Sequence, residues 1–257
     1  MRSQFISTLA LVSATVAQGF KFVRLNKTDA ALLVVDHQIG LAQIVRDIEP
    51  AAFRQNILAH AALGNLFNLP TILTTSAETG PNGQLPQEII DMHPNAPFIR
   101  RNGEVDAWDN PEFKAAVKAT GKSQMIIAGI TTEVCKQPYK TSPEVQFPNK
   151  VFRIGTSFLA LSLIEEGYEV FANTDASGTF SDKIAADANR RMESAGVQLM
   201  GMFGIAMDLM RDWRNTPGTA EVLPFMDKYL IPYGLVARAH GNAITNGTIV
   251  PGEAQII

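Results

Sequence analysis

The sequence predicts an α/β protein in which helices cover both faces of a mostly parallel, doubly wound sheet, a Rossmann-like three-layer αβα arrangement. Three observations lead to this prediction. Continuous apolar runs such as AALLVVD at 30–36 are typical of strands buried on both faces. These runs alternate with amphipathic stretches, which favours parallel βαβ units. The chain of 257 residues, 46% of them hydrophobic and 18% charged, is long enough for one large core.

The elements of the first half follow from local signals. The stretch 49–67 has apolar residues spaced by about three and four, as in a helix, and Pro70 ends that helix and opens a strand. Asn110 and Pro111 form the start of another helix, because asparagine caps and proline suits the first turn, and Gly121 ends it. The predicted elements up to residue 129 are a strand at 30–36, a helix at 49–67, a strand at 70–75, a turn at 80–83, a helix at 84–92, a strand at 97–100, a helix at 111–120 and a strand at 124–129.

The same alternation resumes in the second half. We predict a helix at 158–166, a strand at 168–174, a helix at 181–195, a strand at 197–201 and a helix at 203–213. Prolines at 138, 143 and 148 exclude a helix between these two halves. There is no repeat and no Gly/Ser linker, so we expect one domain. The segment 216–257, rich in Gly, Pro and small residues, is expected to be an arm that packs on the surface or on a partner subunit.

The amino terminus resembles a secretory leader. One positive charge at Arg2 precedes an apolar or small run at 5–17, and Thr15 and Ala17 provide small residues for a cleavage site after Ala17. We therefore expect residues 1–17 to be a signal peptide and the protein to be secreted; the alternative is the tail of a cytoplasmic protein. Sequons at Asn26 and Asn246 agree with export.

Composition argues against several partners. The net charge is −3 and there is no Lys/Arg cluster, so we expect no nucleic-acid partner. The apolar run at 5–17 is too short to span a membrane and no other run is longer, so we expect no membrane partner. The single cysteine, Cys135, excludes an intramolecular disulfide; it is either a buried, inert thiol or one kept for chemistry.

Three residues could form a catalytic set. In a doubly wound sheet, ligands bind at the carboxyl ends of the strands, where the strand order reverses. Asp36 ends the first strand and Cys135 follows the strand at 124–129, so both face one crevice if these strands are neighbours. A carboxylate can take the proton of a thiol, and Arg101 is the best candidate for a nearby cation. The alternatives are a capping carboxylate at Asp36 and a buried apolar side chain at Cys135.

Several ordered blocks make the sequence similar to the isochorismatase-like cysteine hydrolases, and in particular to their YcaC-like branch. The resemblance spans about 22–215. The blocks are DHQIGL, TTSAETGPNG, DAWDNPEF, KATGKSQMIIAGITTEVC, IEEGY, DASGTF and RDWRN.

The resemblance implies an αβα hydrolase that needs no cofactor and assembles as a homo-oligomer. Asp36 would be the base and Cys135 the nucleophile in the hydrolysis of a C–N bond of a small molecule, through a covalent thiol adduct. The family's oxyanion site, at a non-proline cis peptide bond, would fall at Ile130, Thr131 and Thr132.

The sequence departs from the wider family in two places. Arg101 stands where the family usually has lysine; it keeps the charge but cannot donate a proton, so its role would be electrostatic. Residues 136–155 intrude directly after Cys135, and the flanking segments fit the family without them. This segment is either a true insertion that shortens the following helix or a translated intron.

Other residues could contribute to the site. We expect Gln38 to contact substrate, and Trp108 either to line the pocket or to fill the core. His37 is adjacent to Asp36 and should point to the opposite side, which favours packing over a proton relay. We expect no metal, because the Asp-x-His pair of nicotinamidases is absent after the second strand, and the pair Asp91 and His93 follows a later helix and falls short of three ligands.

Three functions remain open on the sequence alone. The first is the cysteine hydrolase acting on a small amide or another C–N substrate. The second is a catalytically inactive binding or structural member, its site disrupted by residues 136–155. The third is a metal-dependent amidase of the nicotinamidase type.

Overall fold

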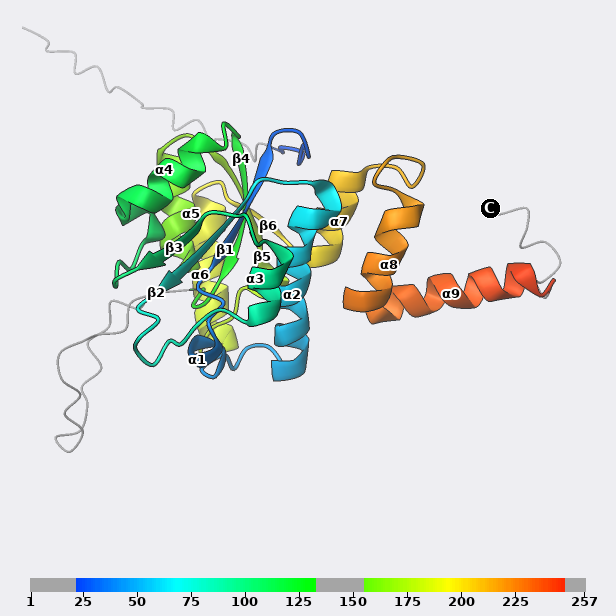
Figure 1. Cartoon of the computed structure of the whole chain (residues 1–257), viewed down its shortest axis with the longest axis horizontal. Helices are drawn as coiled ribbons and strands as arrows, with labels where there is room; N and C mark the ends of the chain where they lie inside the picture. The colour runs from blue at the N-terminus through cyan, green and yellow to red at the C-terminus, as the bar shows by residue number, and fades with distance from the viewer. Residues whose placement is uncertain (1–21, 133–154, 248–257) are drawn as a thin grey trace, which may run out of the picture.

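The computed structural model contains one six-stranded, all-parallel sheet in the order β3-β2-β1-β4-β5-β6 (Figure 1). It describes residues 22–132 and 155–247. The predicted signal peptide, 1–17, and Cys135 lie outside the described residues. The strands are β1 (Ala30–Val35), β2 (Thr71–Ser76), β3 (Phe98–Arg101), β4 (Gln124–Gly129), β5 (Glu169–Asn173) and β6 (Gln198–Met200). The predicted doubly wound α/β fold is confirmed.

The strand order reverses between β1 and β4, which are neighbours as the switch-point argument requires. Their register pairs Val35 with Gly129, so Asp36 and Ile130 follow at the same edge of the sheet. β1, β2 and β4 are buried along their whole length because helices cover both faces. The carboxyl edge beside β1 and β4 is therefore where this fold would bind a ligand.

One face of the sheet is covered by α2 (Pro50–Phe67), α3 (Gln87–Met92) and α7 (Met202–Met210), and α8 (Thr219–Tyr229) packs on the outer side of α2. Their apolar side chains share a core with alternate residues of the strands, among them Leu32, Val34 and Phe171. The short helix α1 (Ile39–Ala42) adds Leu41 to the same core. Strand residues two apart point to one face, which is why Leu32 and Val34 are together here.

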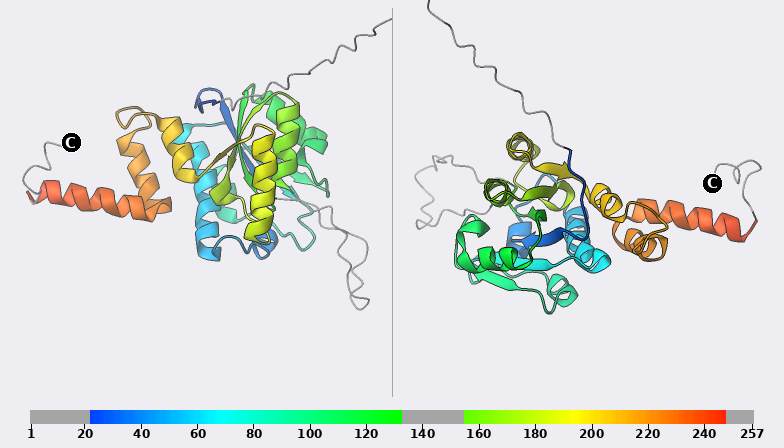
Figure 2. Two further views of the ribbon diagram at one scale, coloured as in Figure 1. Left: turned by 180° about the vertical axis from the view of Figure 1, so that it is seen from behind. Right: turned by 90° about the horizontal axis from the view of Figure 1, so that it is seen from above.

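The opposite face is covered by α4 (Pro111–Ala119), α5 (Thr156–Glu165) and α6 (Asp182–Ser194), as the view from behind shows (Figure 2). Its core contains the other set of strand residues, among them Leu33, Val35 and Ile127. Asn110 caps α4 as predicted, since its side chain accepts a hydrogen bond from the N–H of Phe113 at 2.9 Å.

The observed boundaries differ from the prediction at a few points. Helix α7 ends at Met210, before the predicted 213, because Arg211 has a φ of 69° and leaves the helical conformation. Helix α5 begins at Thr156, two residues before the predicted start. The sequence did not predict α1 or the short 3₁₀ turns Ala107–Asp109 and Thr174–Ala176. None of the helices in the described part of the chain is both long and apolar enough to cross a bilayer.

The predicted C-terminal arm is helical, which the sequence analysis missed. Helix α8 packs on α2 through Val222, Phe225 and Met226. Helix α9 (Ile231–Thr245) then extends away from the body (Figures 1 and 2). Gly234 is what lets α9 approach α8 closely, because a Cβ there would lie 2.3 Å from Oδ1 of Asp227. Glycines and prolines along this segment hid its helical character.

Gly129 fixes the spacing of β4 and β1 beside the switch point. A Cβ at this position would lie 2.4 Å from the carbonyl oxygen of Val35 and 2.8 Å from Oγ1 of Thr156. The first of these atoms belongs to the backbone of a central strand, so it cannot move aside without displacing the sheet. The end of β4 therefore requires glycine.

We predict that Gly129→Ala lowers the free energy of unfolding by about 2 kcal/mol, as expected for overpacking in a core. The matched control is Gly204→Ala in α7, where the nearest atom to a new Cβ is the flexible Cε of Met200 at 3.4 Å. That change should raise stability by roughly 0.5 kcal/mol through helix propensity. Urea unfolding of both variants measures the difference, and equal midpoints would contradict the packing argument.

Candidate active site

Asp36 lies at the end of β1 in an unusual backbone conformation. Its φ is 55°, its N–H donates to the carbonyl of Thr74 at 2.9 Å, and the residue is fully buried. The turn at Asp36 breaks the alternation of the strand. A non-glycine residue with positive φ is uncommon, and such positions often belong to functional sites.

Arg101, the last residue of β3, reaches across β2 to Asp36. Its Nη2 donates to Oδ1 at 2.6 Å and to Oδ2 at 2.5 Å. The arginine side chain is 0% exposed and that of Asp36 1%. Nε donates to Oγ1 of Thr74 at 3.0 Å and Nη1 to the carbonyl of Glu104, so three guanidinium nitrogens have partners. The structure therefore brings these two predicted site residues together as a buried ion pair.

The electrostatics of the pair are set by burial and by mutual attraction. Burial raises the pKa of Asp36, and the charge and hydrogen bonds of Arg101 oppose that rise without cancelling it. A carboxylate with a raised pKa accepts a proton more readily than an exposed aspartate does. Arg101 stays protonated, so within the pair Asp36 is the group able to exchange a proton.

The peptide bond between Ile130 and Thr131 is cis, at the position where the family resemblance placed one. Ile130 forms a bridge with Gly178, and the N–H of Thr132 donates to the Gly178 carbonyl at 3.1 Å. The main-chain N–H of Thr132 is thus already bonded, which leaves the hydroxyl Oγ1 as its polar group for another contact. That oxygen is buried, and no residue of the described part of the chain forms a hydrogen bond with it.

Residues that precede and follow the segment 136–155 are hydrogen-bonded to each other beside this cis peptide bond. The N–H of Thr156 donates to the carbonyl of Thr131 at 2.8 Å, and the N–H of Ser157 donates to that of Thr132 at 3.2 Å. Helix α5 therefore starts directly against the end of β4. Cys135, the proposed nucleophile, lies outside the described residues.

Gln38 is buried and bonded to the backbone of two other segments. Its Oε1 accepts from the N–H of Ser76 at 2.9 Å, and its Nε2 donates to the carbonyls of Ser76 and Gly83. Both N–H donors of the amide are thus used to join the turn at 80–83 to the end of β2. The substrate contact expected for Gln38 stays a prediction. The second lone pair of Oε1 is the part of the amide that could make this contact.

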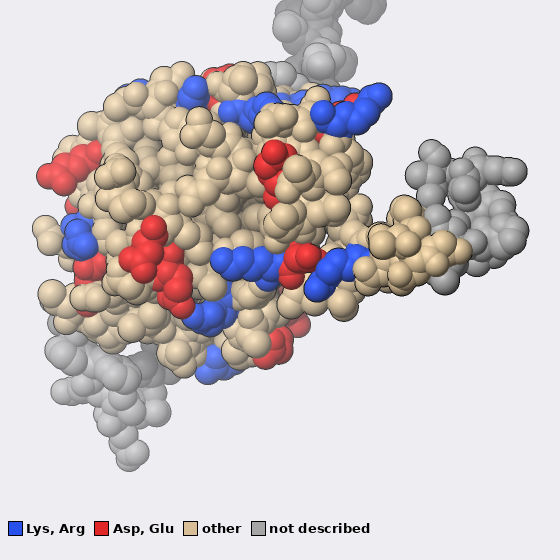
Figure 3. Space-filling view, turned by 45° about the vertical axis from the view of Figure 1, so that its right-hand side comes forward, with Lys and Arg blue, Asp and Glu red and all other residues tan. Residues whose placement is uncertain are grey.

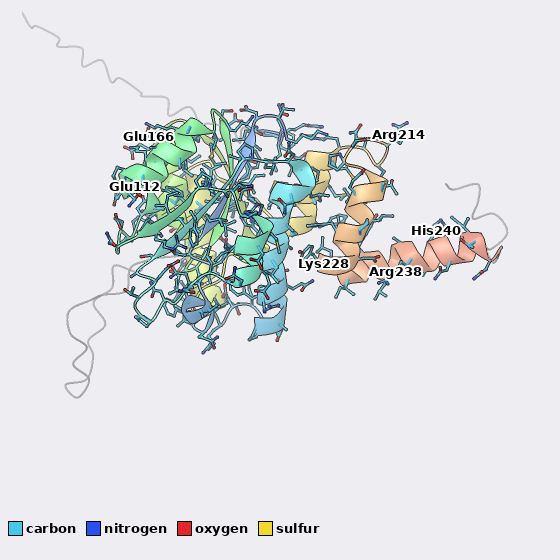
Figure 4. The ribbon with its side chains drawn as sticks, in the orientation of Figure 1. Glu112, Glu166, Arg214, Lys228, Arg238 and His240 are labelled. Carbon is cyan, nitrogen blue, oxygen red and sulfur yellow. The ribbon has the colours of Figure 1, made fainter. Side chains whose placement is uncertain are left out.

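Trp108 lies with the core and not beside the ion pair. It packs among the apolar side chains of the α4 and α5 layer, edge-on to Tyr168 with ring centroids 5.8 Å apart. Its indole Nε1 donates to Glu166 at 3.1 Å, and Glu166 follows α5 at the amino edge of the sheet (Figure 4). The structure therefore favours the core-filling alternative for Trp108 over substrate binding.

His37 and the pair Asp91 and His93 are accounted for by packing. His37 is buried against Phe53 and His60, and its Nε2 lies 2.8 Å from the carbonyl oxygen of Ala176. His93 contacts the Ala61 carbonyl through Nε2, and Asp91 accepts from Gln87. Within the described ranges, no three His, Cys, Asp or Glu side chains lie close enough together to hold a metal ion.

Thr74 and Glu104 are site residues that sequence reasoning missed. The hydroxyl of Thr74 accepts from Arg101 and donates to the carbonyl of Ile99 at 2.9 Å, so it fixes the guanidinium from β2. Glu104 contributes its carbonyl to Arg101 and its carboxylate to Nδ2 of Asn110. A signal existed for Thr74, because a polar residue in a strand buried on both faces needs a partner.

Comparison with known proteins shows which protein family the chain is similar to. A model of the isochorismatase domain matches residues 30–138. The probable hydrolase YcaC of Escherichia coli (strain K12) is 54% identical over 194 residues, which are 76% of this chain and 84% of that protein.

Two solved structures are similar to this chain over most of its length. The YcaC gene product of E. coli, described as an octameric hydrolase of unknown specificity, has a TM-score of 0.76 and 48% identity, with 86% of this chain and 98% of the other covered. YcaC from Pseudomonas aeruginosa, solved with hexane-2,5-diol and covalent acrylamide, has a TM-score of 0.75 and 44% identity, with 86% and 99% covered.

We predict that Arg101→Met lowers the free energy of unfolding by about 3 kcal/mol, because it leaves the Asp36 carboxyl buried without its partner. The double variant Asp36→Leu with Arg101→Met should recover part of this loss, since it removes both charged groups. Arg190→Met is the matched control: Arg190 forms an exposed ion pair with Asp187 on α6 and should unfold like the wild type. An Arg101→Met variant as stable as the control would contradict the importance of the buried pair.

Proposed function

The chain belongs to the isochorismatase-like hydrolases, in the YcaC branch, and on this premise we propose that it hydrolyses a C–N bond of a small molecule with Cys135 as nucleophile. The enzyme class comes from the family. The cysteine mechanism and the amide-type substrate are the proposal. Asp36 is the proposed base, Arg101 the cation that holds it, and no cofactor takes part.

The observation that supports this proposal most is the buried Asp36–Arg101 pair at the carboxyl edge of β1 and β3. A buried ion pair is costly to desolvate and adds little stability by itself. Its position beside the reversal of strand order, where doubly wound sheets bind ligands, favours a functional reason for it. The cis bond at Ile130 lies at the end of the adjacent strand β4.

The proposed reaction moves one proton at a time. Asp36 takes the proton of the Cys135 thiol, and the thiolate attacks the carbonyl carbon, forming a C–S bond. The C–N bond then breaks and the leaving nitrogen takes the proton from Asp36. Water, deprotonated by Asp36, attacks the thioester, the C–S bond breaks, and the sulfur regains a proton as the carboxylic acid leaves.

Charge developing on the carbonyl oxygen needs hydrogen-bond donors. We place that site at residues 130–132, as the resemblance implies. Because the main-chain N–H of Thr132 is bonded to Gly178, the Thr132 hydroxyl is the donor that we propose from this residue. Arg101 contributes by keeping Asp36 oriented, since its own proton is not available.

The covalent acrylamide in the Pseudomonas aeruginosa relative supports a nucleophilic residue in this branch. Acrylamide is an electrophile that reacts readily with thiolates, and the thiolate is the reactive form of cysteine. Cys135 is the single cysteine of this chain. An equivalent adduct here would therefore form on Cys135.

We also propose that the protein works as a homo-oligomer, as its octameric E. coli relative does. Helix α9 supports this proposal. Leu235 and Val236 are 55% and 68% exposed, and Ile231 and Ile244 are exposed on the same helix. The projecting arm has few charged side chains (Figure 3), since Arg238 is the one Lys, Arg, Asp or Glu among the fifteen residues of α9. Such an apolar surface is typical of an interface.

We predict that Cys135→Ala abolishes hydrolysis of the best substrate found in a panel of small amides and hydroxamates, and that Asp36→Asn lowers kcat by about 100-fold or more. Asp36→Asn should also slow alkylation of Cys135 by acrylamide at pH 7, followed by mass spectrometry, because the proton acceptor is lost. Asp187→Asn, on the exposed face of α6, is the control and should react like the wild type.

The same assay separates the alternatives. Hydrolysis that survives Cys135→Ala and is lost with a chelator would identify a metal-dependent amidase. A folded wild type that hydrolyses no member of the panel and whose cysteine resists acrylamide would favour an inactive binding member.

For the assembly, we predict that Leu235→Asp combined with Val236→Asp shifts the protein to a smaller species in size-exclusion chromatography with light scattering. Burying two charges in an interface carries a large desolvation cost. The control is Arg238→Asp, a change of charge on the half-exposed Arg238 near the junction of α8 and α9 (Figure 4). An unchanged mass for the double variant would exclude this surface from the interface.

A further inference from the structure

A chain of hydrogen bonds connects the start of helix α4 to the buried ion pair. It runs from Asn110 to Glu104 and from Glu104 to Arg101, whose Nη2 is bonded to Asp36. The first two of these bonds lie outside the ion pair itself. They provide a route by which a residue that does not touch Asp36 can act on it.

Asn110 uses the two atoms of its side-chain amide for different partners. Its Oδ1 accepts from the N–H of Phe113 at 2.9 Å and caps α4, whereas its Nδ2 donates to Oε1 of Glu104 at 2.8 Å. The residue is 9% exposed, so water competes little for either bond. Aspartate and serine cap helices about as well as asparagine does, so the cap alone does not explain an amide here.

Glu104 is held through both oxygens of its carboxylate. Oε1 accepts from Asn110, and Oε2 accepts from the N–H of Gly103 at 3.1 Å. The main-chain carbonyl of Glu104, in contrast, accepts from Nη1 of Arg101. Residues 102–106 form an irregular loop, so the direction of this carbonyl is not set by a helix or a sheet. The two side-chain bonds orient it.

The direction of the Glu104 carbonyl determines where the guanidinium of Arg101 points. The arginine side chain is 0% exposed, so water does not replace an acceptor that turns away. The guanidinium is planar and rigid, and it is fixed at Nε by Thr74 and at Nη1 by Glu104. These two bonds together aim Nη2 at Asp36.

We propose that Asn110 is a positioning residue: through Glu104, it holds the Arg101 guanidinium in the orientation that pairs with Asp36. Its importance for catalysis rests on the proposed function, in which Asp36 is the base. Position 110 requires an amide because one side chain has to accept from Phe113 and donate to Glu104.

The donor and the acceptor of this link can be interchanged. Asn110→Asp keeps the cap but turns an oxygen toward the Glu104 carboxylate, and Glu104→Gln turns an NH₂ group toward that of Asn110. The double variant rebuilds the link, because the new amide donates to the new carboxylate and its oxygen still accepts from Gly103. The two single changes alter the net charge in opposite directions, so a long-range charge effect does not give both the same result.

Hydrogen exchange of the Arg101 guanidinium with water, followed by heteronuclear NMR on the full-length chain, tests the link without any activity. Exchange should be about tenfold faster in each single variant and return to the wild-type rate in the double variant. Ser162→Ala is the matched control, because it removes a bond to Asp106 in the same loop without touching Glu104. Unchanged exchange in the single variants, no recovery in the double variant, or equal acceleration in Ser162→Ala would overturn the proposal.

The rate at which acrylamide alkylates Cys135 at pH 7 is the separate readout for catalysis. Each single variant should lower this rate by about tenfold, and the double variant should restore it. A wild-type Cys135 that resists acrylamide, with exchange rates as expected, would contradict the proposed function and still support the positioning of Arg101. Normal alkylation in single variants whose exchange is fast would overturn the role of Asn110 in catalysis.

Discussion

The buried ion pair of Asp36 and Arg101 is the constraint around which the carboxyl edge of the sheet is organised. Two charged side chains are removed from water at the ends of strands that are not neighbours, with β2 between them. Such a pair needs additional hydrogen bonds to be tolerated, and Thr74 and the Glu104 carbonyl provide them to the guanidinium. The positive φ of Asp36 and the polar end of β2 are local features that this arrangement requires.

The reversal of strand order determines which part of the chain lies beside the ion pair. Because β4 lies directly beside β1, the turn after Gly129 is next to Asp36, and no side chain at position 129 separates the two strands. Asp36 alone could be a packing feature of a strand end. Together with the adjacent end of β4 it forms an edge where a base and a bound carbonyl could meet, which is why the hydrolase proposal depends on strand order as much as on residue type.

Much of this was predictable from the sequence, for identifiable reasons. Long apolar runs revealed the central strands, and the capping role of Asn110 depends only on residues close in sequence. That Asp36 and the chain after β4 share one edge of the sheet followed from topology once β1 and β4 were neighbours. The support from Thr74 and Glu104 was not predicted, because it depends on where an arginine side chain extends across a strand. The helices α8 and α9 were missed because their stability comes from packing on α2 and on each other, which overrides glycine and proline content.

The turn at Asp36 also decides which face of the sheet each of the two residues at this strand end meets. Had the chain continued as an extended strand, Asp36 would follow Val34 onto the α2 face, and His37 would follow Val35 onto the α4 and α5 face. The left-handed conformation at Asp36 reverses this, so the carboxylate meets Arg101 while His37 packs against Phe53 and His60. One unusual backbone angle thus gives the carboxylate to one face of the sheet and the imidazole to the other.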